Sequence, residues 1–228
     1  MKRETSLNRI AFAAACAQVG LCLSDSQFGH FEQFEENLYL ANEEMNLTRI
    51  PRDEAWVKHF LDSLLFQDLL PENASLLDVG TGPGFPSWPL AQARPDLKVV
   101  ALDSSGKMLG FLRKNPLPNL RIVQARAEEW MPPAEFEVVT GRAVAPLAVQ
   151  LEISAPLAAK GGMVIPMRTP AEEPLLSQDV SALGLELESV HRRELGSSGV
   201  SRLFPIYRKF GRSRPRRSWA EMKRKPLF

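Results

Sequence analysis

Hydrophobic and polar residues follow two different patterns along the chain, and the change falls near residue 73. In residues 30–46, Phe31, Phe34, Leu38 and Met45 recur at near-helical spacing with acidic residues between them. This is the pattern of an amphipathic helix. Together with the segment that follows, it predicts a helical N-terminal extension over residues 1–72.

A second amphipathic segment covers residues 52–70, which begin with acidic residues and end before Pro71. We predict a single helix here, with one apolar stripe formed by Trp56, Phe60, Leu64 and Leu65. His59 and Asp62 lie three positions apart and share another face of that helix. A local hydrogen bond or an interface contact explains this pair more simply than catalysis does.

Between residues 73 and 210 the chain alternates short apolar runs with helical segments. The runs "SLLDV", "KVVALD", "RIVQAR", "FEVVT" and "GGMVIPM" are typical of buried strands in βα units. They predict an α/β fold with a mostly parallel sheet and helices on both faces. Two later runs, "LELESVHRREL" and "RLFPIYRKF", are joined by "GSSGVS" and predict an antiparallel hairpin at the edge of the sheet.

The composition is that of an ordinary globular protein. The 228 residues are 44% hydrophobic and 24% charged, which disfavours both disorder and a membrane protein. No apolar run reaches the roughly 18 residues that a membrane span needs. The two cysteines and three histidines build no metal-ligand spacing, so we predict no metal site and a cytoplasmic protein with free thiols. Residues 1–23 have some features of a signal peptide, but a packed helix fits them as well.

Charge is distributed unevenly along the chain. From Arg202 onward ten basic residues stand against Glu221 alone, a net charge of +9 that leaves −8 for the preceding residues. A basic C-terminal part on an acidic body predicts a polyanionic partner, either nucleic acid or an anionic membrane surface. Aromatic side chains that can stack on bases favour nucleic acid, and they are Phe204, Tyr207, Phe210 and Trp219. A solvated tail over residues 211–228 is the simpler alternative.

The first apolar run leads into a glycine-rich loop, "GTGPGFP", where ligands of open α/β sheets bind. A dinucleotide fingerprint needs glycine at the position of Phe85, and a phosphate-binding loop needs a Gly-Lys-Ser/Thr triplet that is absent. The loop instead resembles the Acid-x-Gly-x-Gly-x-Gly motif of class I S-adenosylmethionine-dependent methyltransferases, with Asp78, Gly80, Gly82 and Gly84 in place.

The residues that follow the next two strands fit the same cofactor. Asp103 ends the second strand and is predicted to bind the two ribose hydroxyls. Ala127 and Glu128 follow the third strand, where the adenine edge would lie. Because the methionine end of S-adenosylmethionine carries an ammonium and a sulfonium, the carboxylate of Asp78 suits it where a pyrophosphate would be repelled.

A more specific resemblance covers about residues 37–168. The segments "NEEMNLTRI", "HFLDSL", "LLDVGTGPGFP", "LDSSGK", "FLR", "ARAEE", "GRAVAPL" and "GGMVIPMR" are similar to successive motifs of the ribosomal RNA small subunit methyltransferase G family, also called glucose-inhibited division protein B. The resemblance implies a Rossmann-like fold and methylation of guanine N7 in 16S ribosomal RNA near the decoding site. It places the cofactor contacts on Gly80, Phe85, Asp103, Ala127, Glu128 and Arg142. The loop departs from the family pattern at Ser87 and Trp88.

Guanine N7 carries a lone pair, so its methylation needs no general base, and positioning supplies most of the catalysis. We predict that Arg142, Arg126 and Arg202 position phosphates, the cofactor carboxylate or the flipped base, and we predict no acid or base. The expected partner of a monomeric chain is 16S ribosomal RNA or the small ribosomal subunit. A non-catalytic RNA-binding or ribosome-associated protein is the alternative, and the basic tail disfavours a small-molecule methyltransferase.

Overall fold

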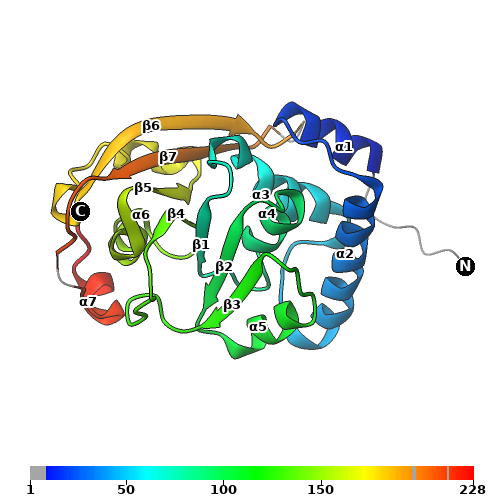
Figure 1. Ribbon diagram of the computed structural model, residues 1–228, viewed down its shortest axis with the longest axis horizontal. Coiled ribbons are helices and arrows are strands. Elements are labelled where there is room, and N and C mark those ends of the chain that lie inside the picture. The colour runs from blue at the N-terminus through cyan, green and yellow to red at the C-terminus, as the bar shows by residue number, and fades with distance from the viewer. Residues whose placement is uncertain (1–8, 197–198, 215) are drawn as a thin grey trace, which may run out of the picture.

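Seven strands form one sheet in the order β3-β2-β1-β4-β5-β7-β6 (Figure 1). The computed structural model describes residues 9–196, 199–214 and 216–228, and our predictions for residues 1–8, 197–198 and 215 lie outside it. The strands are β1 (Ser75–Val79), β2 (Lys98–Asp103), β3 (Leu120–Gln124), β4 (Phe136–Arg142), β5 (Ala158–Met167), β6 (Leu185–Glu194) and β7 (Ser201–Lys209). Strands β1 to β5 pair in parallel, and β7 pairs antiparallel with both β5 and β6. The predicted α/β fold with an antiparallel edge hairpin is confirmed.

The helices are short except for one in the extension. They are α1 (Arg9–Gln18), α2 (Asp25–Met45), α3 (Asp62–Leu64), α4 (Ser87–Ala93), α5 (Gly106–Arg113), α6 (Leu147–Ser154) and α7 (Trp219–Arg224). Single 3₁₀ segments cover Arg52–Glu54, Gln67–Leu69, Ala155–Leu157, Pro170–Leu175 and Ser181–Leu183. Within the described part of the chain, no helix is long and apolar enough to cross a membrane.

Both faces of the central strands are buried, as a parallel sheet requires. Neighbouring residues of the central strands therefore belong to opposite cores, with Leu76 and Val138 in one and Leu77 and Val139 in the other. The first core also contains the apolar side chains of α1, α2, α4 and α5, and the second those of α6 and α7. Figure 1 shows the extension helices at one end of the molecule and α6 and α7 towards the other.

Aromatic packing joins the extension to the helix that follows the glycine loop. Phe34 of α2 stacks on Trp88 of α4, with 4.0 Å between the ring centroids, and the indole of Trp88 donates to the Asn115 carbonyl at 3.0 Å. Trp88 is only 3% exposed. The departure from the family pattern at this position is thus accommodated by α2, which packs against the bulky side chain.

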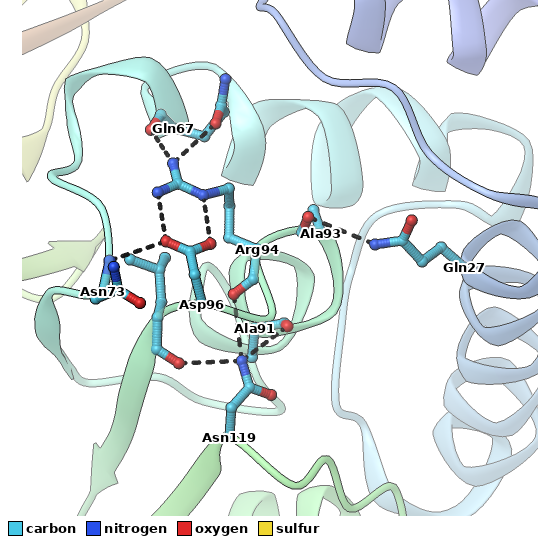
Figure 2. Close-up of polar contacts among 9 residues, drawn as sticks. Gln27, Gln67, Asn73, Ala91, Ala93, Arg94, Asp96 and Asn119 are labelled. Carbon is cyan, nitrogen blue, oxygen red and sulfur yellow. Dashed lines mark hydrogen bonds and ion pairs between the residues drawn. The ribbon is translucent and has the colours of Figure 1, made fainter.

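A polar network fixes the extension to the turn between α4 and β2 (Figure 2). Arg94 donates to the Gln67 carbonyl at 2.9 Å and forms a two-point ion pair with Asp96, whose Oδ2 accepts from the Asn73 amide at 3.0 Å. Gln27 of α2 donates to the Gln92 carbonyl at 2.8 Å. These hydrogen bonds and the ion pair connect α2 and the segment before β1 to α4 and the turn after it. They therefore help to fix the position of β1, which leads into the glycine loop.

The prediction of one continuous helix over residues 52–70 was wrong. The segment changes from a 3₁₀ turn to a π-helix at Trp56–Leu61, then to the short α3, and ends in another 3₁₀ turn. The Asp62 amide bonds the carbonyls of both Val57 and His59, which shows the wide turn. Apolar periodicity identifies the buried face of a helix, but it does not reveal a change from α- to π-type hydrogen bonding. Such π-turns often occur at functional sites.

Candidate active site

A cavity of about 320 Å³ lies at the carboxyl ends of the first four strands. Its walls include Gly80 after β1, Asp103 at the end of β2, Ala127 and Glu128 after β3, and Ala143 after β4. The structure therefore brings four of the predicted cofactor-binding residues to one cavity. This is the position at which ligands of open α/β sheets bind.

Asp103 holds the glycine loop in shape. Its Oδ2 accepts from the Gly82 amide at 2.8 Å, and its Oδ1 accepts from the Ser105 amide at 2.7 Å. Gly82 has φ +58°, and no atom lies within 4 Å of the position that a Cβ would occupy there. Because each carboxylate oxygen can accept more than one hydrogen bond, Asp103 retains acceptor capacity for hydroxyl groups of a ligand.

Asp78 lies beneath the same loop and is fully buried. Its Oδ2 accepts from the Ser87 amide at 3.0 Å, whereas Oδ1 has no hydrogen-bond partner among the described residues. Burial raises the pKa of Asp78 to about 7. The Thr81 and Ser87 hydroxyls and the charge of Arg142 oppose this rise. The unpaired Oδ1 suits a nearby cation such as the methionine end of S-adenosylmethionine, but Asp78 does not line the cavity, so this contact stays a prediction.

Phe85 packs in the core next to the loop. It is 3% exposed, and its ring stacks on His59 with 4.2 Å between the ring centroids. The Arg142 guanidinium lies 5.2 Å from the centroid of Phe85. The loop thus contacts the extension through an aromatic side chain where a dinucleotide fingerprint has glycine. Contact between Phe85 and the cofactor stays a prediction, as does contact from Gly84.

A second cavity, of about 560 Å³, adjoins the first, since Ala143 lines both. Arg142 and Arg202 meet there at a single buried acid, because Asp62 lies 3.1 Å from Arg142 Nη1 and 2.8 Å from Arg202 Nε. The Lys58 carbonyl also accepts from Arg142, at 3.0 Å. The contact predicted for Asp62 is therefore made with the methyltransferase part of the chain, through two arginines.

The three predicted positioning arginines do not lie together. Arg126 lines the first cavity, where its side chain is 57% exposed and lies 3.9 Å from Glu128. Arg142 and Arg202 line the second cavity. Arg126 thus borders one cavity and Arg142 and Arg202 border the other, and the contacts predicted for all three, including that of Arg142 with the cofactor, stay predictions.

Arg168, which was not among the predicted site residues, lines the second cavity as well. It donates to the Ala145 carbonyl at 2.9 Å and pairs with Glu172 at 3.1 Å. Burial lowers the pKa of its guanidinium, although Glu172 opposes this effect. The sequence could have indicated Arg168, because it directly follows the fifth apolar run, just as Arg142 lies close after the fourth.

His59 is neutral in this arrangement. Its Nδ1 faces the Arg142 Nη2, a donor, at 3.4 Å, so Nδ1 acts as an acceptor and Nε2 carries the hydrogen that bonds Thr48 Oγ1 at 2.8 Å. Burial, and then the charge of Arg142, lowers the pKa of His59 to about 3. A histidine with this pKa does not serve as a general base near pH 7.

We expect the stability contribution of His59 to depend on pH. The unfolded chain takes up a proton on this residue near pH 6.5, and the folded chain does so only near pH 3, so the contribution is full above pH 6.5 and is lost as the pH falls towards 3. The advantage of wild type over His59→Gln in unfolding free energy should shrink by about 2 kcal/mol between pH 7 and pH 5, measured by urea denaturation. His191→Gln on β6 is the matched control. A difference in unfolding free energy that stays constant between pH 7 and pH 5 would contradict the assignment of His59 as neutral.

The prediction that four C-terminal aromatic residues stack on bases was wrong for two of them. Phe204 and Tyr207 are fully buried because β7 lies between β5 and β6, with both of its faces covered. Phe210 is 47% exposed, and Trp219 lines the first cavity. Strand β7 is therefore integrated into the sheet, whereas most described residues from 211 onward are half-buried or exposed.

Comparison with known proteins identifies the family. Residues 27–195 match the family described as "GidB: rRNA small subunit methyltransferase G". The chain belongs to the rRNA small subunit methyltransferase G family. It is 38% identical to the ribosomal RNA small subunit methyltransferase G of Lactobacillus delbrueckii subsp. bulgaricus over 78% of this chain and 80% of that protein. It is 40% identical to that of Ligilactobacillus salivarius, over 69% and 71%.

Solved structures agree with the fold of this methyltransferase G family member. The 1,6-didemethyltoxoflavin-N1-methyltransferase of Burkholderia thailandensis, solved with S-adenosylhomocysteine, has a TM-score of 0.54 at 16% identity and covers 80% of this chain and 90% of its own. TYW2 of M. jannaschii, solved with AdoMet, has a TM-score of 0.53 at 16% identity, over 65% and 75%. At these identities the likeness establishes a Rossmann-like methyltransferase fold, as predicted.

Proposed function

We propose that this protein transfers a methyl group from S-adenosylmethionine to N7 of a guanine in 16S ribosomal RNA, near the decoding site. Family membership makes it an S-adenosylmethionine-dependent methyltransferase of small-subunit ribosomal RNA. The main structural support is that two adjoining cavities, both lined by Ala143, have different polar residues. The first contains Asp103, an acid placed to bind ribose hydroxyls, and the second contains two arginines paired with one buried acid.

The first cavity is the proposed donor pocket, defined by Gly80, Asp103, Ala127, Glu128 and Ala143. When bound, S-adenosylmethionine supplies an electrophilic methyl group on a sulfonium. Asp103 accepts hydrogen bonds from the ribose hydroxyls, and Ala127 with Glu128 borders the adenine. Asp78 stabilises the cationic methionine end through its unpaired Oδ1. These residues bind and orient, and none of them needs to move a proton.

The second cavity is the proposed acceptor pocket, defined by Lys58, Asp62, Arg142, Arg168 and Arg202. Guanidinium groups donate to the O6 edge of guanine or to RNA phosphates, which fixes the base with N7 towards the methyl group. N7 attacks through its own lone pair, so catalysis rests on alignment. Methylation moves the positive charge from the sulfonium to the base, so the total charge of donor and acceptor does not change.

We also propose a cytoplasmic monomer that acts on 16S ribosomal RNA or on the small subunit, with the chain divided into residues 1–72, 73–210 and 211–228. Part of the predicted basic character is used internally, since Arg202 and Arg208 pair with Asp62 and Glu188. Lys223, Arg224 and Lys225 remain exposed for phosphate contacts.

Purified protein should incorporate labelled methyl groups from S-adenosylmethionine into 16S ribosomal RNA or intact small subunits, with the label recovered as N7-methylguanosine. S-adenosylhomocysteine should suppress incorporation, because it occupies the donor pocket without a methyl group to give. Label in another nucleoside would refute the N7 assignment. RNA binding that is salt-sensitive but without any incorporation would favour the non-catalytic alternative.

A further inference from the structure

The C-terminal helix α7 is held against the body of the protein by one buried acid. Glu152 of α6 is 4% exposed, accepts from Arg217 at 2.6 and 2.5 Å, and forms an ion pair with Arg214 Nη2 at 2.6 Å. Arg217 also donates to the Lys225 carbonyl at 2.9 Å, beyond the last turn of α7. Met222, in the middle of the helix, is 1% exposed. The segment before α7 is thus anchored on α6 through Glu152, Met222 buries the centre of the helix, and Arg217 ties the end of α7 back to its start.

This docking brings an indole to the donor pocket. Ser218 caps α7, with its hydroxyl accepting from the Glu221 amide, and the first helical residue is Trp219. Trp219 lines the same cavity as Ala127, Glu128 and Asp103. Among the residues that the structure describes, its ring takes part in no aromatic stack or hydrogen bond. Trp219 packs partly against the second core and, without an aromatic partner among the described residues, borders the space beside the predicted adenine edge.

The segment that carries Trp219 is better suited to a role in the donor pocket than to RNA binding, because of the contacts that its arginines make. Arg214 and Arg217 share one counter-ion, Glu152, and Arg216 donates to the carbonyls of Trp130 and Pro156. These arginines use N–H groups on acceptors within the protein, so fewer N–H groups remain to bind RNA phosphates. The basic residues at 214–217 act as an anchor for the helix.

We propose that Trp219 is a binding residue for the adenosyl part of the methyl donor and that α7 forms a wall of the donor pocket. The proposal rests on the assignment of that pocket to S-adenosylmethionine. Adenine offers a flat π face, and stacking of an aromatic side chain on a base contributes strongly and without sequence preference. The basic C-terminal segment thereby contributes to cofactor binding.

The test is calorimetric binding of S-adenosylmethionine and S-adenosylhomocysteine to full-length variants. Trp219→Ala should raise both Kd values by about 5-fold to 150-fold, the range expected for loss of one base stack. Trp219→Phe should retain most of the affinity, because phenylalanine also offers a ring. Phe210→Ala is the matched control, since Phe210 is an exposed aromatic residue just after β7 and lies outside the donor pocket. Its Kd values should equal those of wild type.

The possible failures are distinguishable. If Asp103→Ala loses donor binding while Trp219→Ala binds as wild type does, the role of Trp219 is refuted and the pocket stands. If neither variant changes the Kd, the pocket itself is wrongly assigned. Should Trp219→Ala fail to fold, tryptophan fluorescence decides the matter. The change on adding donor should be lost in Trp219→Phe and kept in Trp56→Phe, which alters a tryptophan of the extension, and the reverse result would overturn the proposal.

Discussion

Asp103→Ala is expected to weaken binding of S-adenosylmethionine by about 100-fold or more. Hydrogen bonds to a charged acceptor contribute about 1.5 to 3 kcal/mol each, and the carboxylate is placed to accept from two ribose hydroxyls. The variant also loses the acceptors of the Gly82 and Ser105 amides, which shape the glycine loop. Isothermal titration calorimetry measures the effect directly.

The control for this variant is Asp179→Ala. Asp179 accepts from the Ser181 amide at 2.9 Å, which is the same turn that Asp103 makes with Ser105, but it lies away from the donor pocket. Its removal should leave the affinity unchanged. Asp103→Asn, which keeps one acceptor oxygen, should fall between wild type and Asp103→Ala. Wild-type affinity in Asp103→Ala would contradict the assignment of the pocket.

Asp62→Asn is expected to lower the free energy of unfolding by roughly 3 to 5 kcal/mol and to reduce methyl transfer. The acid is 2% exposed and pairs with both Arg142 and Arg202, so its neutralisation leaves two arginines near each other without their counter-ion. Donor affinity should change little, because these arginines line the acceptor pocket. Urea denaturation and single-turnover methylation give the two values.

The matched control is Asp68→Asn in the same segment of the extension. Asp68 pairs with Arg193 at 2.9 Å, but the side chains are 41% and 32% exposed, so about 0 to 1 kcal/mol is expected. Adding Arg202→Gln to Asp62→Asn should restore part of the lost stability, since it removes one of the uncompensated charges. If Asp62→Asn is as stable as Asp68→Asn, Asp62 does not organise the acceptor pocket.

Local patterns were enough to predict the sheet and the grouping of Asp103, Ala127 and Glu128 at one cavity. The run "SLLDV" coincides with β1 and "KVVALD" with β2, because buried strands bounded by turn residues leave a clear signal. Asp103, Ala127 and Glu128 follow strands in a parallel sheet, and the carboxyl ends of such strands meet at one edge. Their proximity therefore follows from the order of elements along the chain.

The acceptor pocket could not be predicted in the same way. Asp62 contacts Arg202 across 140 positions, and Glu152 contacts Arg217 across 65. No period of 2 or 3.6 residues encodes such pairs, which depend on how the extension and the C-terminal segment pack on the sheet. The net charge along the chain has the same weakness as evidence for a partner, because it does not show that Arg214 and Arg217 are both engaged by Glu152.

The most direct test of the proposed function is to map N7-methylguanosine in the 16S ribosomal RNA of cells that lack this protein. We expect loss of one such site, its restoration by the wild-type protein, and no restoration by Asp103→Ala produced at the same level. Persistence of every N7-methylguanosine in the absence of the protein would contradict the assignment.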